Sequence, residues 1–365
     1  MQRPDVVAWV LSVATGLRLS QAKTLAELTA AALSVGRASL AALGRRLAGD
    51  TTAKHRIKRA WRFCANERVE VSAAMSGVIG RLTRRRTKPL LVALDWVEVR
   101  DFHTLMAAAV RRGRAVPLLW ASYPEWVLFR SQNSLEEGLL RLLRSLVPAG
   151  VRIILLADRG FGRAELAKTC RAIGVSFVIR IKPDVRVRHP RYTGRLDDFP
   201  IRPGCWRTLT GAEYRSDGAV TLNVAVRWKK GLPPRRDEPW FLMTDLDRNA
   251  AAISDLYAQR MTVEELFRDG KSCRNGSALR LTQLTRADRL DRLLLILALA
   301  YILLTGLGTI ARARWRPGVW CSSNDEQQCS VYTIGRVMLD RMEESPDAAW
   351  RAVAAATIET VPKWG

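Results

Sequence analysis

The sequence predicts an α/β protein in which a helical segment precedes a sheet and a short, mostly helical tail follows it. Three observations support this prediction. Apolar residues recur with helical spacing over residues 1–88, strand-like apolar runs alternate with helical segments over residues 89–310, and about residues 184–240 are rich in Arg, Pro and Gly with an alternating TLNVAVRW run. We therefore expect a helical domain over 1–88, an α/β domain over 89–310 with a β-rich insertion at about 184–240, and a C-terminal tail over 311–365.

The charge of the chain favours a polyanionic partner. Its 365 residues include 59 Lys and Arg against 35 Asp and Glu, a formal net charge of +24, and 48% of them are hydrophobic. Residues 1–90 hold 17 basic and 5 acidic residues, so half of the excess charge (17 − 5 = 12) lies in a quarter of the chain. This composition excludes a disordered polymer and indicates nucleic acid as the first partner, with an anionic membrane second.

Cysteine and histidine usage indicates a cytoplasmic protein without a zinc or disulfide framework. The six cysteines are scattered with no C-x-x-C, and only three histidines occur. The N-terminal MQRPDVVAWVLSVATGLRLS favours an amphipathic helix over a signal peptide. We expect reduced thiols and a reducing cytoplasm.

The segment TTAKHRIKRAWRFCAN predicts a basic helix in the N-terminal part. One helical stripe would carry Ile57, Ala60, Trp61 and Cys64, with Trp61 packed inward. A solvated basic face is the simpler interpretation, but the local charge concentration favours contact with DNA phosphates. The candidate phosphate-binding cations are Lys54, Arg56, Lys58, Arg59 and Arg62.

The sheet is predicted from apolar runs after residue 88. PLLVALDW (89–96) predicts a buried strand, and HTLMAAAV and AVPLLWASYP predict two more joined by a turn at RRGR. LEEGLLRLLRSL predicts a helix, VRIILLADRG (151–160) a buried strand, AELAKTCRAIG a helix, and VSFVIRIK and WFLMTDL strands. A helix is expected from residue 250 to about 269, and another in DAAWRAVAAATIET near the C-terminus.

One apolar stretch reaches the lower limit of a membrane span. Residues 293–310 (LLLILALAYILLTGLGTI) contain no charge, with basic residues on both sides. The stretch contains two glycines and stands alone, so we favour a helix buried in a large core and expect no membrane partner.

Two aspartates follow the apolar part of their strands. Asp95 ends LLVALD and Asp158 ends IILLAD. Alone, Asp95 could cap a turn and Asp158 could pair with Arg159. However, an ionised carboxylate after a dry run is costly unless it is paired or bound to metal, and Mg²⁺ prefers oxygen ligands. The repeated pattern therefore predicts a metal-binding pair.

A third carboxylate is expected on the helix DLYAQRMTVEELFRDGKS. On one continuous helix, Tyr257, Arg260, Glu264 and Lys271 would fall within a single 60° sector, computed at about 100° per residue. A solvated face with ordinary ion pairs is the alternative. These four residues also form the signature Y-x2-R-x3-E-x6-K.

Together these motifs resemble the DDE transposases of the insertion-sequence-four family, which carry the YREK signature. The resemblance runs from KHRIKRAWRF through LVALDW, LADRGF and EPWFLMTDL to the YREK helix, in that order. It implies an RNase H-like catalytic core with a β-rich insertion before the last catalytic carboxylate. It further implies cut-and-paste transposition through DNA hairpins by a homodimer that binds double-stranded terminal inverted repeats and target DNA.

The resemblance also implies roles for particular residues. Asp95, Asp158 and Glu264 would be the catalytic triad that holds two Mg²⁺ ions, or Mn²⁺ in their place. Two ions about 4 Å apart share such ligands and stabilise the attacking and leaving oxygens. The DNA contacts implied outside the N-terminal part are Tyr257, Arg260, Lys271 and Trp240, with Arg180 and Lys182 as weaker candidates.

Two departures and two alternatives remain open. Gly270 is expected to loosen the last helical turn before Lys271, and the short tail leaves the dimer surface undefined. An inactive or domesticated DNA-binding protein of the same fold would bind DNA without cutting it. A structure-selective nuclease would cut branched DNA without needing terminal repeats.

Overall fold

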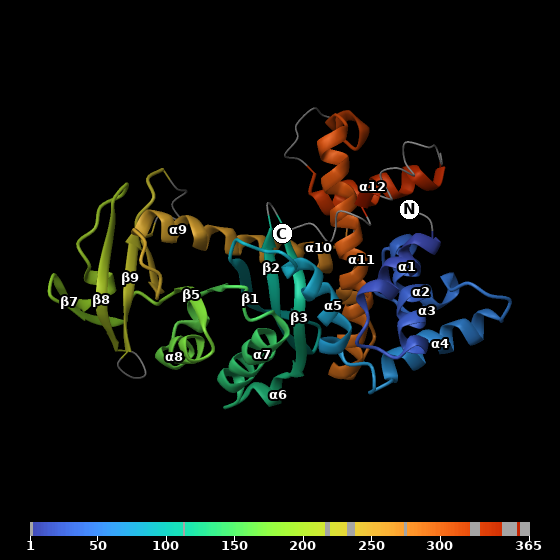
Figure 1. Ribbon diagram of the computed structural model, residues 1–365, viewed down its shortest axis with the longest axis horizontal. Helices are drawn as coiled ribbons and strands as arrows, with labels where there is room; N and C mark the ends of the chain where they lie inside the picture. The colour runs from blue at the N-terminus through green and yellow to red at the C-terminus, as the bar shows by residue number, and fades with distance from the viewer. Residues whose placement is uncertain are drawn as a thin grey trace.

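The computed structural model describes residues 3–111, 114–215, 220–231, 238–273, 276–321, 329–344 and 356–357. Within these ranges the chain forms a helical N-terminal part, a large mixed sheet covered by helices on both faces, and a long buried helix near the C-terminal end (Figure 1).

The N-terminal part contains five helices: α1 (Arg3–Val13), α2 (Leu19–Val35), α3 (Leu40–Arg46), α4 (Ala53–Ala65) and α5 (Val71–Thr83). Close helix packing depends on glycine here, because a Cβ on Gly77 of α5 would lie 2.0 Å from the Val13 carbonyl oxygen. The predicted basic helix is α4, but its buried residues are Ala60, Phe63 and Cys64. Trp61 is 40% exposed, so the prediction that it packs inward is wrong. Phe63 fills the core position in its place.

The sheet contains ten strands in the order β3-β2-β1-β4-β5-β10-β9-β8-β6-β7. The strands β1, β4 and β5 are parallel, while β2 and β3 form an antiparallel meander with β1. This 3-2-1-4-5 order is consistent with the RNase H-like core that we expected. The bounds are β1 (Leu90–Val99), β2 (Phe102–Arg111), β3 (Arg114–Pro124), β4 (Ile153–Ala157), β5 (Val175–Arg180), β6 (Arg186–His189), β7 (Tyr192–Arg195), β8 (Trp206–Arg215), β9 (Val220–Arg227) and β10 (Trp240–Thr244).

Helices cover both faces of this sheet. In Figure 1, α6 (Glu125–Leu128), α7 (Gln132–Leu146) and α8 (Ala164–Ala172) lie below it, and α9 (Ala250–Ala258) and α10 (Thr262–Lys271) lie above it. Side chains alternate between the two faces along a strand. On β1, Trp96 contacts Glu136 of α7, whereas Asp95 contacts Arg260 at the start of α10. Asp95 therefore faces α9 and α10.

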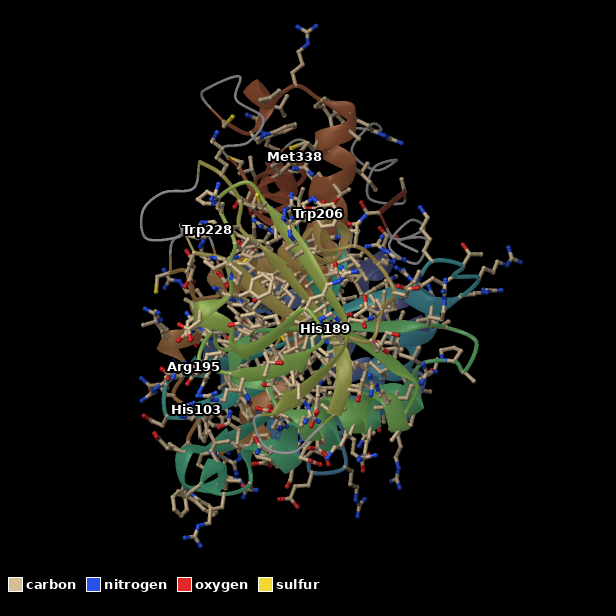
Figure 2. The ribbon with its side chains drawn as sticks, turned by 90° about the vertical axis from the view of Figure 1, so that its left-hand side faces the viewer. His103, His189, Arg195, Trp206, Trp228 and Met338 are labelled. Carbon is tan, nitrogen blue, oxygen red and sulfur yellow. The ribbon has the colours of Figure 1, made fainter. Side chains whose placement is uncertain are left out.

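The β-rich segment extends the sheet. After β5 the chain forms β6 to β9, and β10 then returns antiparallel to β5, with Leu242 opposite Arg180. Figure 2 looks onto this end of the molecule, where Trp206 of β8 and His189 of β6 are labelled and His103 of β2 lies well apart from them. The added strands place β9 and β10 beside the helix that carries the Y-x2-R-x3-E motif.

The apolar stretch forms α11 (Ala287–Arg314), a 28-residue helix. It is the one described helix that is long and apolar enough to cross a membrane, and 89% of its apolar window is buried inside the protein. Burial of this extent is typical of a core helix. A further helix, α12 (Val331–Glu344), packs against α11. The sequence patterns did not predict α12, and most of the predicted final helix lies outside the described residues.

The helix expected from residue 250 to about 269 forms, but it is not a uniform α-helix. A 3₁₀ turn at Gln259–Met261 joins α9 to α10. This turn has about 3.0 residues per turn in place of 3.6, so the angle between Tyr257 and Glu264 differs from the one calculated for a regular α-helix. Arg260 and Glu264 still share a face, because they form an ion pair.

Candidate active site

Asp95 and Asp158 lie side by side at the centre of the sheet. The strands β1 and β4 are parallel, and their register pairs Leu94 with Ala157, the residues just before the two aspartates. Neighbouring strands are separated by roughly 5 Å, so the two aspartate backbones lie about that far apart. A side-chain oxygen of Asp158 also accepts a hydrogen bond from the Gly160 backbone N–H at 2.8 Å, which holds the turn that ends β4.

Arg260 links Asp95 to Glu264. Its Nη1 donates to Asp95 Oδ2 at 2.8 Å, and its Nη2 donates to Glu264 Oε1 at 2.9 Å. Arg260 is 7% exposed, and the side chain of Glu264 is 44% exposed. The structure thus gathers Asp95 and Glu264 around one guanidinium, with Asp158 on the adjacent strand.

The electrostatics of Asp95 reflect this crowding. Burial raises the pKa of Asp95 to about 6; Arg260 opposes the rise, and Asp158 adds to it. Burial lowers the pKa of Arg260, but Asp95, Tyr257, Asp158 and Glu264 together raise it, and the net shift is upward. The site therefore holds concentrated negative charge with a buried cation at its centre.

The donor chemistry of this cluster fits a hard divalent cation. Three carboxylates from two strands and a helix are the oxygen ligands that Mg²⁺ prefers. Among the described residues, no group of three or more His, Cys, Asp or Glu side chains is close enough together to hold a metal ion. In this arrangement Arg260 pairs with both Asp95 and Glu264.

The opposite face of β1 is anchored by a buried network. Trp96 Nε1 donates to Glu136 Oε1 at 2.8 Å, and Glu136 also forms a buried ion pair with Arg163, just before α8. These contacts fix the strand one residue beyond Asp95. Sequence patterns did not indicate this network, because its members come from three distant segments. The available signal was Glu136, a charged residue on the face of α7 that also carries the buried leucines.

Aromatic residues border the site on the side of β10. Tyr257 is buried and packs edge-to-face against Trp240, with ring centroids 5.1 Å apart. The Lys229 ammonium lies 5.3 Å from the centroid of the Trp240 ring. Burial raises the pKa of Tyr257, opposed by Arg260 and Arg180, which indicates that both arginines lie near its hydroxyl.

Arg180 and Lys182 leave β5 at the same edge. Arg180 forms an ion pair with Glu238, immediately upstream of β10, whereas Lys182 is exposed. Both residues therefore lie on the side of the sheet where Trp240 begins its strand. The structure brings them near the aromatic pair and leaves Lys182 accessible to a ligand.

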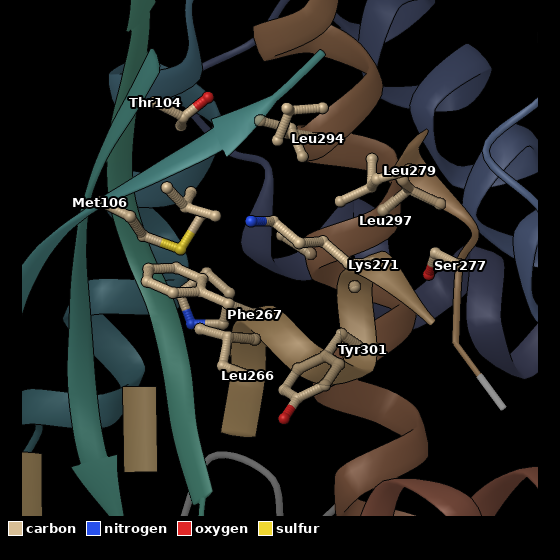
Figure 3. A pocket seen from close by; sticks show the side chains of 15 residues that line it. Thr104, Met106, Leu266, Phe267, Lys271, Ser277, Leu279, Leu294, Leu297 and Tyr301 are labelled. Carbon is tan, nitrogen blue, oxygen red and sulfur yellow. The ribbon is translucent and has the colours of Figure 1, made fainter. Parts of the chain in front are cut away.

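Lys271 is separated from this cluster. It ends α10 and points into a cavity of about 60 Å³ between the sheet, α10 and α11, lined by Met106, Phe267 and Leu294 among others (Figure 3). Burial, with Arg280 in addition, lowers the pKa of Lys271. Lys271 remains within α10, so the expectation that Gly270 loosens this turn is not met.

The five N-terminal candidates lie on α4, away from the sheet in Figure 1. Arg56 is partly buried and donates to the Gly49 carbonyl oxygen at 2.9 Å. The other four are exposed: Lys54, Lys58, Arg59 and Arg62. They form a basic helix face that is open to solvent.

Sequence reasoning also missed a second ionic cluster on α10. Arg114, at the start of β3, pairs with Glu265 and Asp269, at 3.3 Å and 3.2 Å respectively. Burial raises the pKa of Asp269 to about 6, and Arg114 opposes the rise. This cluster fixes the side of α10 that faces away from Glu264. Glu265 is therefore a structural residue, although it is the sequence neighbour of Glu264.

Comparison with protein families supports the chemistry suggested by this geometry. Residues 123–303 match the family model for the transposase DDE domain, which covers just under half of the chain. The matched range contains Asp158 and Glu264 and begins after Asp95. The match supports a DDE transposase, and such proteins are DNA-acting nucleases and transferases that typically use a divalent metal. No curated protein matches the sequence.

Proposed function

We propose that this protein is a DNA transposase that moves an insertion sequence by cutting and rejoining DNA strands. The observation that carries the proposal is the position of Asp95 and Asp158 on adjacent parallel strands, with Arg260 joining Asp95 to Glu264. The family match over residues 123–303 supports the same conclusion. The finer assignment is the insertion-sequence-four family with its YREK signature, acting by cut-and-paste through hairpin-ended DNA.

In this proposal Asp95, Asp158 and Glu264 hold two Mg²⁺ ions, which Mn²⁺ can replace. The bound ions supply activation of the attacking oxygen and stabilisation of the leaving oxygen in phosphoryl transfer. The chain positions the three carboxylates on rigid elements, two strands and a helix, and the Glu136 network holds β1 from behind.

Arg260 has two roles in the proposal. Without ions it neutralises Asp95 and Glu264. When cations take over that role, its guanidinium is free to turn toward the phosphate that is being transferred, where positive charge stabilises the transition state. Arg260 is thus a DNA contact that becomes available only when the carboxylates have another partner.

The remaining DNA contacts follow from exposure and position. Trp240, which packs against the buried Tyr257, is the ring on which an unstacked base stacks. Tyr257, Arg180 and Lys182 are the proposed contacts to backbone phosphates beside it. The exposed cations of α4 bind duplex phosphates away from the cut. Lys271 contacts DNA only if its ammonium leaves the apolar cavity of Figure 3.

The proposed organisation keeps three units: a helical DNA-binding domain over 1–88, a catalytic domain over 89–310 and a tail over 311–365 with a role in dimerisation. The proposed partners are the terminal inverted repeats, the target DNA and a second copy of the chain.

Cleavage of the element's own terminal DNA tests the proposal. Duplexes with and without the terminal repeats, and a branched duplex, are incubated with Mg²⁺ and the protein, and strand breaks are resolved on denaturing gels. We expect cuts at the repeat boundary, and a loss of at least about 100-fold for Asp95→Asn, Asp158→Asn and Glu264→Gln, because each removes charge from the reacting centre.

The matched control is Glu265→Gln, which removes the neighbouring carboxylate from the same helix, while its partner Arg114 keeps the ion pair with Asp269. It should cleave at near the wild-type rate. Equal losses in the Glu264 and Glu265 variants, or cleavage of branched DNA regardless of the repeats, would contradict the proposal.

A further inference from the structure

A basic cleft lies on the same sheet face as the carboxylates. It has a volume of about 630 Å³. It is formed by the start of β1, the end of β2, the beginning of β3, and the helices α9 and α11. Leu91 and Ile154 form part of its floor and are direct neighbours in the β1–β4 register. Asp95 and Asp158 stand four residues further along the same two strands and on the same face. At about 3.3 Å per residue, the floor of the cleft is roughly 13 Å from the aspartates.

The charge of this cleft is one-sided. Its described lining includes no Asp or Glu, and it includes five cationic side chains: Arg86, Lys88, Arg111, Arg114 and Arg248. Arg114 has acidic partners on α10, as described above. Arg86, Lys88 and Arg248 bring positive charge to the cleft, and among the described residues that line it none carries a carboxylate.

Arg86 and Arg111 lie close enough together to repel each other electrostatically. Burial, together with the positive charge of Arg86, lowers the pKa of Arg111 to about 10. The Nε and Nη2 groups of Arg86 donate to the carbonyl oxygens of Lys88 and Pro89, but its Nη1 is buried without a hydrogen-bond partner. A buried cation with an unused donor is unfavourable unless an anion completes it.

Neutral polar residues also line the cleft: Gln259, which precedes Arg260, and Thr305 and Thr309 of α11. The two threonine hydroxyls donate to carbonyl oxygens of their own helix, which leaves the Gln259 amide as a neutral group beside the arginines. An amide beside arginines is typical of sites for phosphate oxygens.

We propose that this cleft binds backbone phosphates of the DNA strand that crosses the catalytic centre. The inference rests on the proposed function, because it takes the anion to be DNA. At 3.4 Å per base step along the duplex axis, the separation of roughly 13 Å corresponds to about four steps from the phosphate that is cut. The cleft thus sets where along the strand cleavage falls.

The salt dependence of DNA binding tests the inference. The full-length protein is titrated onto a fluorescent terminal-repeat duplex in EDTA, which prevents cleavage, and anisotropy gives the association constant between 50 and 200 mM NaCl. Lys88→Gln/Arg248→Gln is the test variant, because both side chains are exposed and their replacement leaves the fold intact. Each lost phosphate contact reduces the slope of log K against log salt by about 0.9, so we expect a reduction of about 1.8.

The charge-matched control is Arg141→Gln/Lys168→Gln on α7 and α8, on the opposite face of the sheet. Its slope should stay close to that of the wild type. Equal slopes in the two double variants would overturn the inference. Melting curves followed by circular dichroism verify that both variants are folded.

Two further measurements separate the possible explanations. If calorimetry shows that inorganic pyrophosphate binds the wild type and not the Lys88/Arg248 variant, while the DNA slopes are equal, the cleft holds a free phosphate compound and the inference fails. If the wild type cuts repeat DNA but the two double variants have equal salt slopes, the proposed cleft fails and the proposed transposase function stands. Absence of both cleavage and DNA binding in the wild type would instead remove the proposed function itself.

Discussion

Arg260 is the residue on which the electrostatics of the candidate site depend. It is almost fully buried and donates to carboxylates from two different elements, Asp95 on β1 and Glu264 on α10. Breaking a buried ion pair leaves an uncompensated charge and costs several kcal/mol, whereas an exposed pair contributes little. The contact with Asp95 is therefore the one that matters for stability.

Replacing Arg260 by Met should lower the free energy of unfolding by about 3 kcal/mol at pH 8, where Asp95 is ionised. Because the carboxylates then lack a countercharge, added Mn²⁺ should raise the melting temperature of Arg260→Met more than that of the wild type. Denaturant unfolding and thermal shift measure the two effects.

The control on the same helix is Arg268→Met. Arg268 is 70% exposed and pairs only with Glu265 among the described contacts, so its loss should change stability by less than about 0.5 kcal/mol. Similar behaviour of the two variants would show that Arg260 does not neutralise the triad.

Asp291 predicts a pH dependence at a second buried carboxylate. Burial raises its pKa to about 7, against hydrogen bonds from Ser122 and the charge of Arg292. The ordinary pKa of an unfolded aspartate is about 3.9, so the folded protein binds the extra proton between about pH 4 and 7. The stability contributed by that proton is present below about pH 4 and is lost as the pH rises through 7.

Asp291→Asn removes this loss, because the amide remains neutral and can still accept from the Ser122 backbone N–H. The folded and unfolded pKa values differ by about 3, so at pH 8 the variant should be more stable than the wild type by on the order of 4 kcal/mol, and at pH 4.5 by less than about 1 kcal/mol. Urea unfolding at the two pH values measures it. A difference that is independent of pH would disprove the assignment.

Single side chains were the hardest level to predict. The sequence indicated Asp95 and Asp158, because each follows a dry strand, but the partners of Asp95 and the position of Lys271 depend on long-range packing. Trp61 illustrates the problem: Ala60 and Cys64 are buried as predicted, but the buried stripe includes Phe63 and leaves out Trp61. Periodicity alone does not decide which of two aromatic residues at opposite edges of the stripe is buried.

At the scale of elements, the crossing of α11 and α12 depends on two glycines. A Cβ on Gly308 would lie 1.7 Å from the Val331 carbonyl oxygen, and one on Gly335 would lie 2.0 Å from the Leu304 carbonyl oxygen. The two helix backbones therefore touch, and no larger residue fits without separating them.

Gly335→Ala should destabilise the protein by about 2 kcal/mol, because the methyl group forces the helices apart. Gly138→Ala is the control: no atom lies within 4 Å of its Cβ position on α7, and Ala is the better helix former by about 1 kcal/mol. We expect the control to unfold at equal or higher temperature in differential scanning calorimetry. Matching losses in the two variants would contradict the close crossing.

Strands and helices were largely predictable where the apolar pattern is strong. The strands β1, β4 and β5 and the helices α4, α7 and α8 fall where periodicity places them. The 3₁₀ turn at Gln259–Met261 was not predictable, because Gln-Arg-Met contains neither Gly nor Pro and the turn arises where Arg260 turns toward Asp95. The helix α12 was missed because it is stabilised by close packing against α11 at Gly308 and Gly335, and such long-range contacts leave no pattern in the sequence.

At the scale of the whole molecule, the sheet order produces the site. Asp95 and Asp158 are 63 residues apart in the sequence (158 − 95), and they become neighbours because β4 pairs with β1 in parallel. Both aspartates were predicted at or near the ends of their strands; Asp158 directly follows β4, whereas Asp95 lies within β1, which continues to Val99. The sequence also leaves open whether the two strands are adjacent. The β-rich insertion was predictable from composition, but its joining of the same sheet through β9 and β10 was not.

The sheet also organises charge across the molecule. Acidic side chains meet at the centre of one face, a basic cleft lies beside them, and a basic helix projects from the N-terminal part. This arrangement suits a polyanion that is held by cations and processed at carboxylates. It explains how a protein with a net charge of +24 can keep a negatively charged centre.

The most direct test of the central claim is anomalous X-ray scattering from crystals of the protein soaked in Mn²⁺. If the three carboxylates form the metal site, manganese peaks should lie within coordination distance of Asp95, Asp158 and Glu264. The Arg260 guanidinium should be displaced from its contacts with Asp95 and Glu264. Manganese bound elsewhere, or no peak beside these carboxylates while Arg260 remains in place at saturating Mn²⁺, would contradict the claim.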